Sequence, residues 1–331
     1  MPRNAARPAA RLSIAPMMDW TDRHCRSFHR QITGQALLYT EMVTAQAVVH
    51  GPRDRLLGFD LAEQPLALQL GGADPATLAE ATRIAAAYGY AEINLNVGCP
   101  SDRVKSGCFG AVLMKSPDLV ADCAAAMIAA SPVEVTVKCR IGVDDQDPTE
   151  VLPAFLDTIA AAGVRRVMIH ARKAWLQGLS PKENREIPPL DYALVLAMKR
   201  QFPHLHISVN GGITSLEQAC SFLDQGLDGV MLGRAAYHEP WDSLSSVDAR
   251  IFGGAPGPDR FAVVDRMRPY IARHLASGGR LHQITRHMLG LFHNRPGARH
   301  WRRILSERAN APGAGLEVVD AALEAVDRRA A

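Results

Sequence analysis

The sequence predicts an α/β protein, a TIM (β/α)8 barrel followed by an all-helical C-terminal domain. Between residues 11 and 234, short apolar runs rich in β-branched residues alternate with longer segments of helical spacing. This alternation predicts a parallel sheet covered by helices. Residues 253–258 read GGAPGP, a cluster that breaks regular structure, and beyond it the spacing is helical only. We therefore expect a catalytic barrel domain over residues 1–249 and a helical domain over residues 250–331.

Eight apolar runs predict the strands of the barrel. A closed barrel of eight strand–helix units takes roughly 250 residues. Eight such units in this chain therefore favour a closed barrel over an open sheet. No GxGxxG motif follows the first run, and this argues against an open dinucleotide-binding sheet. The expected strands are 11–17, 36–42, 66–70, 91–96, 134–140, 166–172, 206–212 and 228–234.

Alanine- and leucine-rich segments predict the helices. Their apolar residues recur with the spacing of one helix face. Those between the strands are 75–88, 117–130, 150–162, 191–201 and 215–226, and those of the C-terminal domain are 259–276, 280–292, 299–309 and 315–329.

Composition limits the class of protein. Hydrophobic residues make up 47% of the chain and charged residues 21%, which is typical of globular proteins, and a net charge of +3 says little about partners. The six cysteines form no CxxC pair, so we expect no metal site and a reducing compartment. No run approaches the ~20 apolar residues of a membrane span, and the N-terminus lacks the apolar core of a secretion signal. We expect a cytoplasmic protein without membrane contact, and a monomer.

Polar residues gather where the expected strands end. A strand that is buried on both faces should be almost wholly apolar, so polar groups there need partners or a ligand. In a barrel these ends form the face that carries the active site. Any one of these residues could be a simple cap, but the whole set favours a ligand site. Its members are Pro16, Met17, Glu41, Gln69, Asn94, Asn96, Lys138, Arg140, His170, Arg172, Asn210, Gly211, Gly212, Gly233 and Arg234.

Glycines follow the seventh and eighth strands, in Asn210-Gly211-Gly212 and Gly233-Arg234. The loops after these strands often bind phosphate in this fold, and glycine lets backbone N–H groups approach the anion. Arg234 would add charge and a fork of donors. The alternative is a pair of tight turns with no ligand.

Two further residues indicate chemistry. Lys138 lies in the apolar run VTVKCR, and a buried lysine needs an anionic partner or a lowered pKa. An anionic ring such as a reduced flavin would provide that partner. Cys99 lies in a glycine-rich loop after the fourth strand, with Arg103, Lys105 and Cys108 nearby in the chain. A loop cysteine near positive charge can be reactive, although an inert thiol remains the alternative.

Several motifs together resemble the tRNA-dihydrouridine synthase family over nearly the whole chain. The loop with Cys99 is the most specific of them. The segment 170–190, HARKAWLQGLSPKENREIPPL, further resembles the proteobacterial subgroup that acts on D-loop positions 20 and 20a. The motifs are APMMDWTD (15–22), LYTEM (38–42), LALQLGG (66–72), EINLNVGCPSDRVKSGCFGAVLM (92–114), VKCRIG (137–142), MIHARKAWLQG (168–178), VNGGI (209–213) and MLGRAAYHEPW (231–241).

The resemblance implies FMN as cofactor, NADPH as electron donor and tRNA as substrate. Hydride would pass from reduced FMN to C6 of a uracil, and Cys99 would give a proton to C5. The cofactor would be bound by Pro16, Met17, Met18, Gln69, Lys138, His170, Asn210, Gly211, Gly212, Gly233 and Arg234. The tRNA would be bound by Asn96, Arg140, Lys182, Arg185, Arg299 and Arg302.

The expected C-terminal domain is rich in arginine, which gives the phosphate attraction of an RNA-binding face. A solvated helix surface is the alternative. For the whole protein three other functions remain open: an FMN barrel reductase of free pyrimidines or enones, a non-catalytic RNA-binding protein, and a phosphosugar enzyme.

Overall fold

A computed structural model describes residues 8–101 and 109–326 of the chain. Eight parallel strands lie in one sheet, in the order β1-β8-β7-β6-β5-β4-β3-β2. Leu37, just before β2, closes the ring against β1: it donates to the carbonyl of Leu12 at 3.1 Å and accepts the N–H of Ile14 at 2.9 Å. The predicted barrel is confirmed. Its strands are β1 (Leu12–Ile14), β2 (Leu38–Thr44), β3 (Leu66–Gly71), β4 (Glu92–Val97), β5 (Glu134–Arg140), β6 (Arg166–His170), β7 (His206–Asn210) and β8 (Gly229–Leu232).

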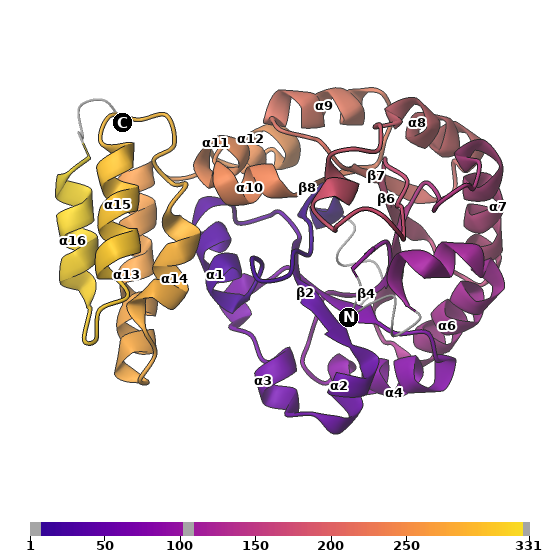
Figure 1. The fold of residues 1–331 in the computed structure, drawn as a ribbon, viewed down its shortest axis with the longest axis horizontal. Coiled ribbons are helices and arrows are strands. Elements are labelled where there is room, and N and C mark those ends of the chain that lie inside the picture. The colour runs from indigo at the N-terminus through magenta and orange to yellow at the C-terminus, as the bar shows by residue number, and fades with distance from the viewer. Residues whose placement is uncertain (1–7, 102–108, 327–331) are drawn as a thin grey trace. The chain divides into compact units, whose positions relative to one another are not determined.

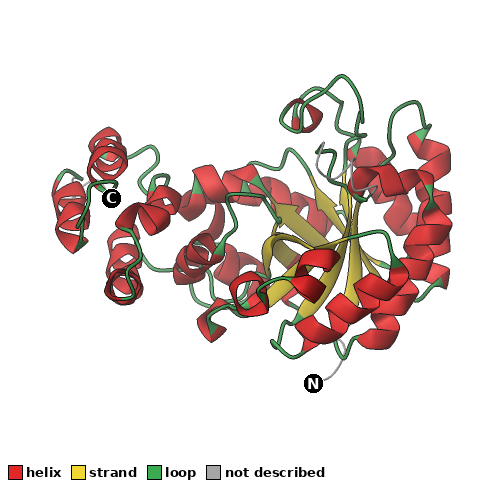
Figure 2. Ribbon diagram, turned by 60° about the horizontal axis from the view of Figure 1, so that its bottom comes forward, coloured by secondary structure: helices red, strands yellow, loops and turns green. Residues whose placement is uncertain are grey.

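Helices surround these strands (Figure 2). Aspartates that accept backbone N–H bonds begin three of them: Asp74, Asp147 and Asp191. Such caps satisfy donors that a helix leaves free at its first turn. The five helices expected between strands are present within about two residues of their predicted ends. The helices of the barrel are α2 (Ala45–His50), α3 (Arg53–Leu57), α4 (Pro75–Ala86), α6 (Pro117–Ala130), α7 (Pro148–Ala161), α8 (Tyr192–Gln201) and α9 (Leu216–Asp224).

Charged residues fill the barrel near the N-terminal ends of its strands. Arg166, of which 1% is exposed, pairs with Glu92 and Glu134. Tyr39 donates its hydroxyl to Glu92 at 2.5 Å. Buried charges are tolerated when they are paired and hydrogen-bonded, as these are. The N-terminal end of the barrel, its floor, is therefore filled by a polar cluster whose members are paired with one another.

The chain forms two compact units. The first holds the barrel strands. The second takes Asp19–Ala36, Thr214–Leu216 and the described residues from Arg234 onward. This division differs from the boundary that we expected between residues 249 and 250. Helix α1 (Arg23–Ile32), which the sequence analysis did not expect, packs against α13 (Arg260–Ala276) and α14 (Leu281–Met288), and so it belongs with the second unit (Figure 1).

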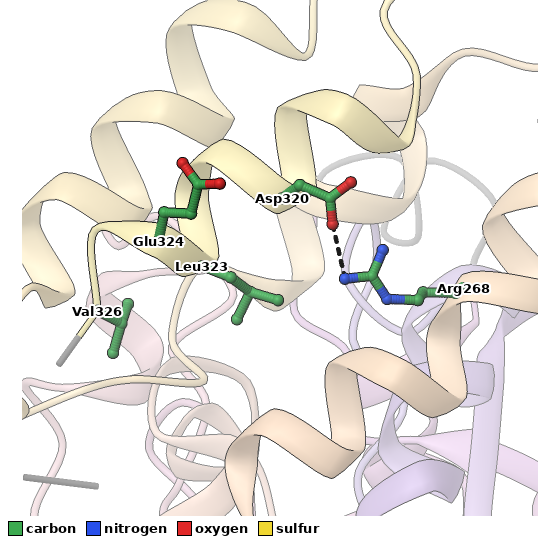
Figure 3. A pocket seen from close by; sticks show the side chains of 5 residues that line it. All are labelled: Arg268, Asp320, Leu323, Glu324 and Val326. Carbon is green, nitrogen blue, oxygen red and sulfur yellow. Dashed lines mark ion pairs between the residues drawn. The ribbon is translucent and has the colours of Figure 1, made fainter. Parts of the chain in front are cut away.

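The helices expected in the C-terminal part of the chain are present. Trp301 is fully buried there and donates its indole N–H to the carbonyl of Met288 at 3.0 Å. A small hollow lies beside Arg268 and Asp320, whose side chains pair at 2.7 Å (Figure 3). The remaining helices of this unit are α10 (Arg234–His238), α11 (Pro240–Leu244), α12 (Val247–Phe252), α15 (Ala298–Arg308) and α16 (Leu316–Glu324). In the described part of the chain no helix combines the length and the apolar character needed to cross a lipid bilayer.

Candidate active site

The carboxyl ends of β3 to β7 bring the predicted site residues together inside the first unit. Asn96 pairs with Lys138 across β4 and β5, and Arg140, His170 and Asn210 are aligned across β5, β6 and β7. Alternate residues of a strand face the same side, so these side chains point into the mouth of the barrel. The register confirms that neighbouring strands place these polar residues side by side.

Asn96 holds the start of the cysteine loop. Its side-chain oxygen accepts the backbone N–H of Gly98 at 3.1 Å and that of Cys99 at 3.0 Å. Its amide nitrogen donates to Gln69 at 2.8 Å. Only 7% of Asn96 is exposed, and its oxygen and one of its two amide N–H groups hold neighbouring groups.

A chain of hydrogen bonds continues from Gln69 down to the floor of the barrel. Gln69 donates to Asn94 at 2.8 Å, and Asn94 donates to the hydroxyl of Thr136 at 2.8 Å. Thr136 in turn donates to Glu92, the carboxylate that pairs with Arg166. Glu92, Asn94 and Thr136 are completely buried.

The carboxylate at the bottom sets the direction of every bond in this chain. A carboxylate paired with arginine accepts only, so Thr136 must donate to Glu92 and accept from Asn94. The oxygen of Asn94 must then accept from Gln69, and the oxygen of Gln69 from Asn96. The donor and acceptor requirements alone therefore determine which end of each amide is the oxygen and which is the nitrogen.

Cys99 itself is partly exposed and contacts the hydroxyl of Ser101 through its sulfur at 3.4 Å. Its carbonyl accepts the N–H of Ala111 at 2.9 Å, which ties the beginning of the loop to its end. Arg103, Lys105 and Cys108 lie outside the described residues. The described part of the site therefore presents one accessible thiol on an anchored backbone.

Arg140 acts on this loop as a clamp. Its Nε donates to the carbonyl of Gly98, and its Nη1 donates to the carbonyls of Lys173 and Asn184, all at 2.9 Å. Only 3% of Arg140 is exposed, and burial lowers its pKa to about 10. The guanidinium thus joins the cysteine loop to the loop after β6, and Nη2 has no bond to a described residue.

Lys138 lies between Asn96 and Met168 with its side chain partly exposed at the mouth. Burial, with a contribution from the charge of Arg140, lowers its pKa to about 8. Among the described residues, none forms an ion pair or a hydrogen bond with its ammonium group. A desolvated cation in this position favours an anionic ligand.

His170 packs against the glycines after β7. Gly211 has a φ of +107°, and a Cβ there would lie 2.3 Å from Cδ2 of His170. Burial and the nearby charges of Arg140 and Lys138 keep the pKa of His170 well below its usual value, so its ring is neutral at pH 7. Glycine is required here for both conformation and space.

A set of backbone donors is available after β7 and β8. Asn210 fixes the two strand ends by donating to the carbonyl of Met231 at 2.8 Å. Within the described ranges, the N–H groups of Gly212 and Gly233 have no acceptor, and a Cβ at Gly233 would meet nothing within 4 Å. Arg234, the first residue of α10, falls in the second unit.

The other predicted residues are more exposed. Pro16 and Met17 are half-buried after β1, and 54% of Met18 is exposed. Lys182 and Arg185 are exposed beside the short helix Glu183–Arg185.

Arg299 and Arg302 are exposed on α15, and neither forms an ion pair with another described residue. Other arginines of this unit have structural partners. Arg260 is buried, pairs with Asp242 at 2.6 Å and stacks on Trp241. The number of arginines in this part of the sequence therefore overstates the positively charged surface that could bind RNA.

Thr136, Glu92 and Asn184 are the residues that sequence reasoning missed. A signal was present, because EINLN and EVTVKCR carry polar residues at every second position of buried strands. We interpreted only the strand ends, whereas the same face is polar down to the floor of the barrel.

The chain is similar to proteins of a known family. A family profile described as dihydrouridine synthase (Dus) matches residues 13–327. This chain belongs to the dihydrouridine synthase family. The match spans both compact units, and the resemblance found in the sequence is confirmed.

Curated relatives of this dihydrouridine synthase are similar along nearly their whole length. A tRNA-dihydrouridine(20/20a) synthase of Vibrio cholerae is 59% identical over 95% of this chain and 96% of its own. Proteins of the same name from Xanthomonas campestris pv. campestris and Escherichia coli are 55% and 57% identical, with at least 97% of each chain covered.

A solved structure shares the fold of this family member. The old yellow enzyme homologue of Zymomonas mobilis covers 75% of this chain and 90% of its own, with a TM-score of 0.50 and 12% identity. At that identity the likeness shows the barrel fold alone.

Proposed function

We propose that this dihydrouridine synthase reduces the C5–C6 double bond of uridines 20 and 20a in the D-loop of tRNA, with FMN as cofactor and NADPH as electron donor. The names of relatives that are 55–59% identical support the substrate and the two positions. The single observation that carries the chemistry is the anchored thiol of Cys99 above a mouth lined by Lys138, Asn96 and Arg140.

The residues present fit FMN. The ammonium of Lys138, without a partner among the described residues, would face the anionic edge of the ring. Gln69 would reach the same edge, with an amide direction set from below. The free N–H groups of Gly212 and Gly233 would hold the phosphate, with Asn210 fixing their strands and Arg234 adding charge. Pro16, Met17, Met18 and the neutral His170 would contact the ring.

FMN, when bound and reduced by NADPH, supplies the hydride that C6 of the uracil receives. Cys99 completes the reaction, because its thiol transfers a proton to C5 and remains on the protein as a thiolate. Its partial exposure lets the thiolate regain a proton from water. Asn96 and Nη2 of Arg140 would donate to the uracil oxygens, where negative charge develops before C5 is protonated.

The target base must leave its stack in tRNA to reach this mouth, which costs a few kcal/mol. Contacts with other parts of the tRNA offset this cost. Exposed Lys182 and Arg185 on the barrel unit, and Arg299 and Arg302 on the second unit, are the cations that we assign to phosphate binding. We thus assign the reaction to the barrel and much of the tRNA affinity to the helices near the C-terminus.

The test uses purified protein, tRNA that lacks modification, free uridine and NADPH. We expect yellow protein that releases FMN on denaturation, forms dihydrouridine in tRNA and leaves free uridine unchanged. Reduction of free uridine without reduction of tRNA would instead identify a reductase of free pyrimidines. A colourless protein that binds no FMN would overturn the proposed chemistry.

A further inference from the structure

Trp175 stands out on the loop after β6 as a large aromatic side chain that is exposed in a rigid setting. Of this residue 38% is accessible to solvent, although tryptophan is usually well buried. Its backbone is held at both polar groups by one side chain. Asn184 accepts the N–H of Trp175 at 2.7 Å and donates to its carbonyl at 2.9 Å.

The neighbours of Trp175 are fixed as well. Asp144 donates its backbone N–H to the carbonyl of Ala174 and accepts the N–H of Leu176 through its side chain, both at 2.8 Å. Asn184 is completely buried and also donates to the carbonyl of Leu179 at 3.2 Å. The contacts within the loop therefore fix the backbone of Trp175, and part of the indole is exposed.

This loop is also tied to the reactive loop. Arg140 donates to the carbonyl of Asn184 and to that of Gly98, each at 2.9 Å. Gly98 precedes Cys99, so a single guanidinium sets the position of the Trp175 segment relative to the thiol. The segment that carries Trp175 therefore lies at the carboxyl ends of the strands, on the same face of the barrel as the reactive loop.

Positive charge accompanies the ring. The ammonium of Lys173 lies 5.3 Å from the ring centroid, over one face of the indole. Arg172, Lys182 and Arg185 belong to the same loop. A partly exposed aromatic ring with one cation over it and further cations on its own loop suits a nucleobase with its phosphates, since any base has a face that can stack on an aromatic ring.

We propose that Trp175 is a stacking platform for a nucleobase that flanks the target uridine in the tRNA. The platform holds the neighbouring base in place while the uridine turns into the barrel mouth. This inference rests on the proposed function, because it needs an RNA substrate. It assigns to Trp175 a part of the binding energy that offsets unstacking of the target base.

The test compares Trp175→Ala, Trp175→Phe and the matched control Leu61→Ala. Leu61 is also an exposed apolar residue, but it precedes β3 and so lies at the opposite end of the strands. We expect Trp175→Ala to weaken equilibrium tRNA binding by about 5- to 150-fold, the range of one base–aromatic stack. Trp175→Phe should recover most of the affinity, and NADPH-driven flavin reduction should be unchanged in every variant.

A tRNA with an abasic nucleotide on either side of the target uridine identifies the stacked base. One of the two abasic substrates should bind the wild type more weakly, and Trp175→Ala should cause no further loss on that substrate. Unchanged tRNA affinity in Trp175→Ala, or an equal loss on intact and both abasic substrates, would overturn the platform. If the wild type bound tRNA tightly but formed no dihydrouridine, the proposed function would be contradicted. The effect of Trp175 on tRNA binding could still be measured in that case.

Discussion

The side-chain oxygen of Asn96 accepts the backbone N–H of Cys99 at 3.0 Å. This bond is the upper end of a chain that begins at the paired carboxylate of Glu92 on the barrel floor. Because each amide in the chain has a forced direction, Asn96 offers its acceptor to the cysteine loop and keeps a second N–H for the mouth. The floor of the barrel thus determines which groups the reaction site presents.

A change at Thr136 tests this chain of hydrogen bonds, because Thr136 lies beneath the site and we assign it no contact with a ligand. Thr136→Val keeps the shape but leaves Asn94 without its acceptor, which should cost about 1–3 kcal/mol of unfolding free energy. We also expect a shifted absorption spectrum of bound FMN through Gln69 and slower dihydrouridine formation. Thr136→Ser, which retains the hydroxyl, should restore both. A valine variant with wild-type stability and spectrum would show that the chain has no such role.

Cys99 should be essential for turnover but not for cofactor binding. Cys99→Ala removes the proton donor, so dihydrouridine formation should fall by about 10²- to 10⁴-fold, which is typical for loss of a general acid. FMN content and NADPH oxidation should stay at wild-type levels. Cys220→Ala, a partly exposed thiol on α9, serves as the control and should be fully active. Normal dihydrouridine yield from Cys99→Ala, measured by mass spectrometry, would remove the acid role.

The affinity of the apoprotein for FMN should depend on pH through Lys138. Its pKa of about 8 in the free protein should rise when an anionic ligand binds, because the ligand stabilises the charged form. Affinity is then constant below pH 8 and falls as the pH rises above 8, where binding requires uptake of a proton. Anaerobic absorbance titrations with reduced FMN, whose ring carries the negative charge, measure this. Lys138→Met should bind FMN more weakly and without that decline, and an identical decline in the variant would exclude Lys138 as its source.

Gly211 should tolerate no side chain. Gly211→Ala places a methyl group against the ring of His170 in a backbone conformation with a φ of +107°. Gly226→Ala is the matched control, since its φ is +97° but a Cβ there would meet nothing within 4 Å. Both should lose about 1 kcal/mol or more of stability from the backbone alone. Only Gly211→Ala should also lose FMN affinity, and equal FMN binding by the two variants would contradict the phosphate and ring contacts that we assign to this turn.

Arg299 and Arg302 test the assignment of tRNA affinity to α15. The double change Arg299→Glu with Arg302→Glu should weaken tRNA binding and reduce its dependence on salt, because fewer phosphate contacts release fewer counterions. NADPH oxidation should not change. Arg83→Glu with Arg200→Glu, at exposed residues of α4 and α8, gives the same change in net charge and serves as the control. If the two proteins bind tRNA equally well, α15 does not contact the RNA.

Most of the fold could be predicted from the sequence because barrel strands and amphipathic helices have strong periodic patterns. The eight strands lie where the apolar runs indicated, although β1, β6, β7 and β8 end two or three residues earlier than expected. Helix α1 was missed, because its ten residues include five that are basic or histidine and few that are apolar. Its burial depends on α13 and α14, which lie more than two hundred residues away in the chain.

The site could be predicted in part for a similar reason. Glycine pairs, a lysine in an apolar run and a cysteine in a glycine-rich loop are local signals, and each falls at the barrel mouth. The hydrogen-bonding role of Arg140 could not be predicted, because its partners come from two loops that follow different strands. Sequence indicated that Arg140 contacts substrate, whereas most of its donors hold backbone carbonyls.

The most direct test of the account is to map dihydrouridine along tRNA treated with the purified holoenzyme and NADPH. We predict that dihydrouridine forms at positions 20 and 20a, that other uridines remain unmodified, and that Cys99→Ala forms it about 10²- to 10⁴-fold more slowly. Dihydrouridine at other positions only, or none in tRNA from an enzyme that binds FMN and oxidises NADPH, would contradict the account.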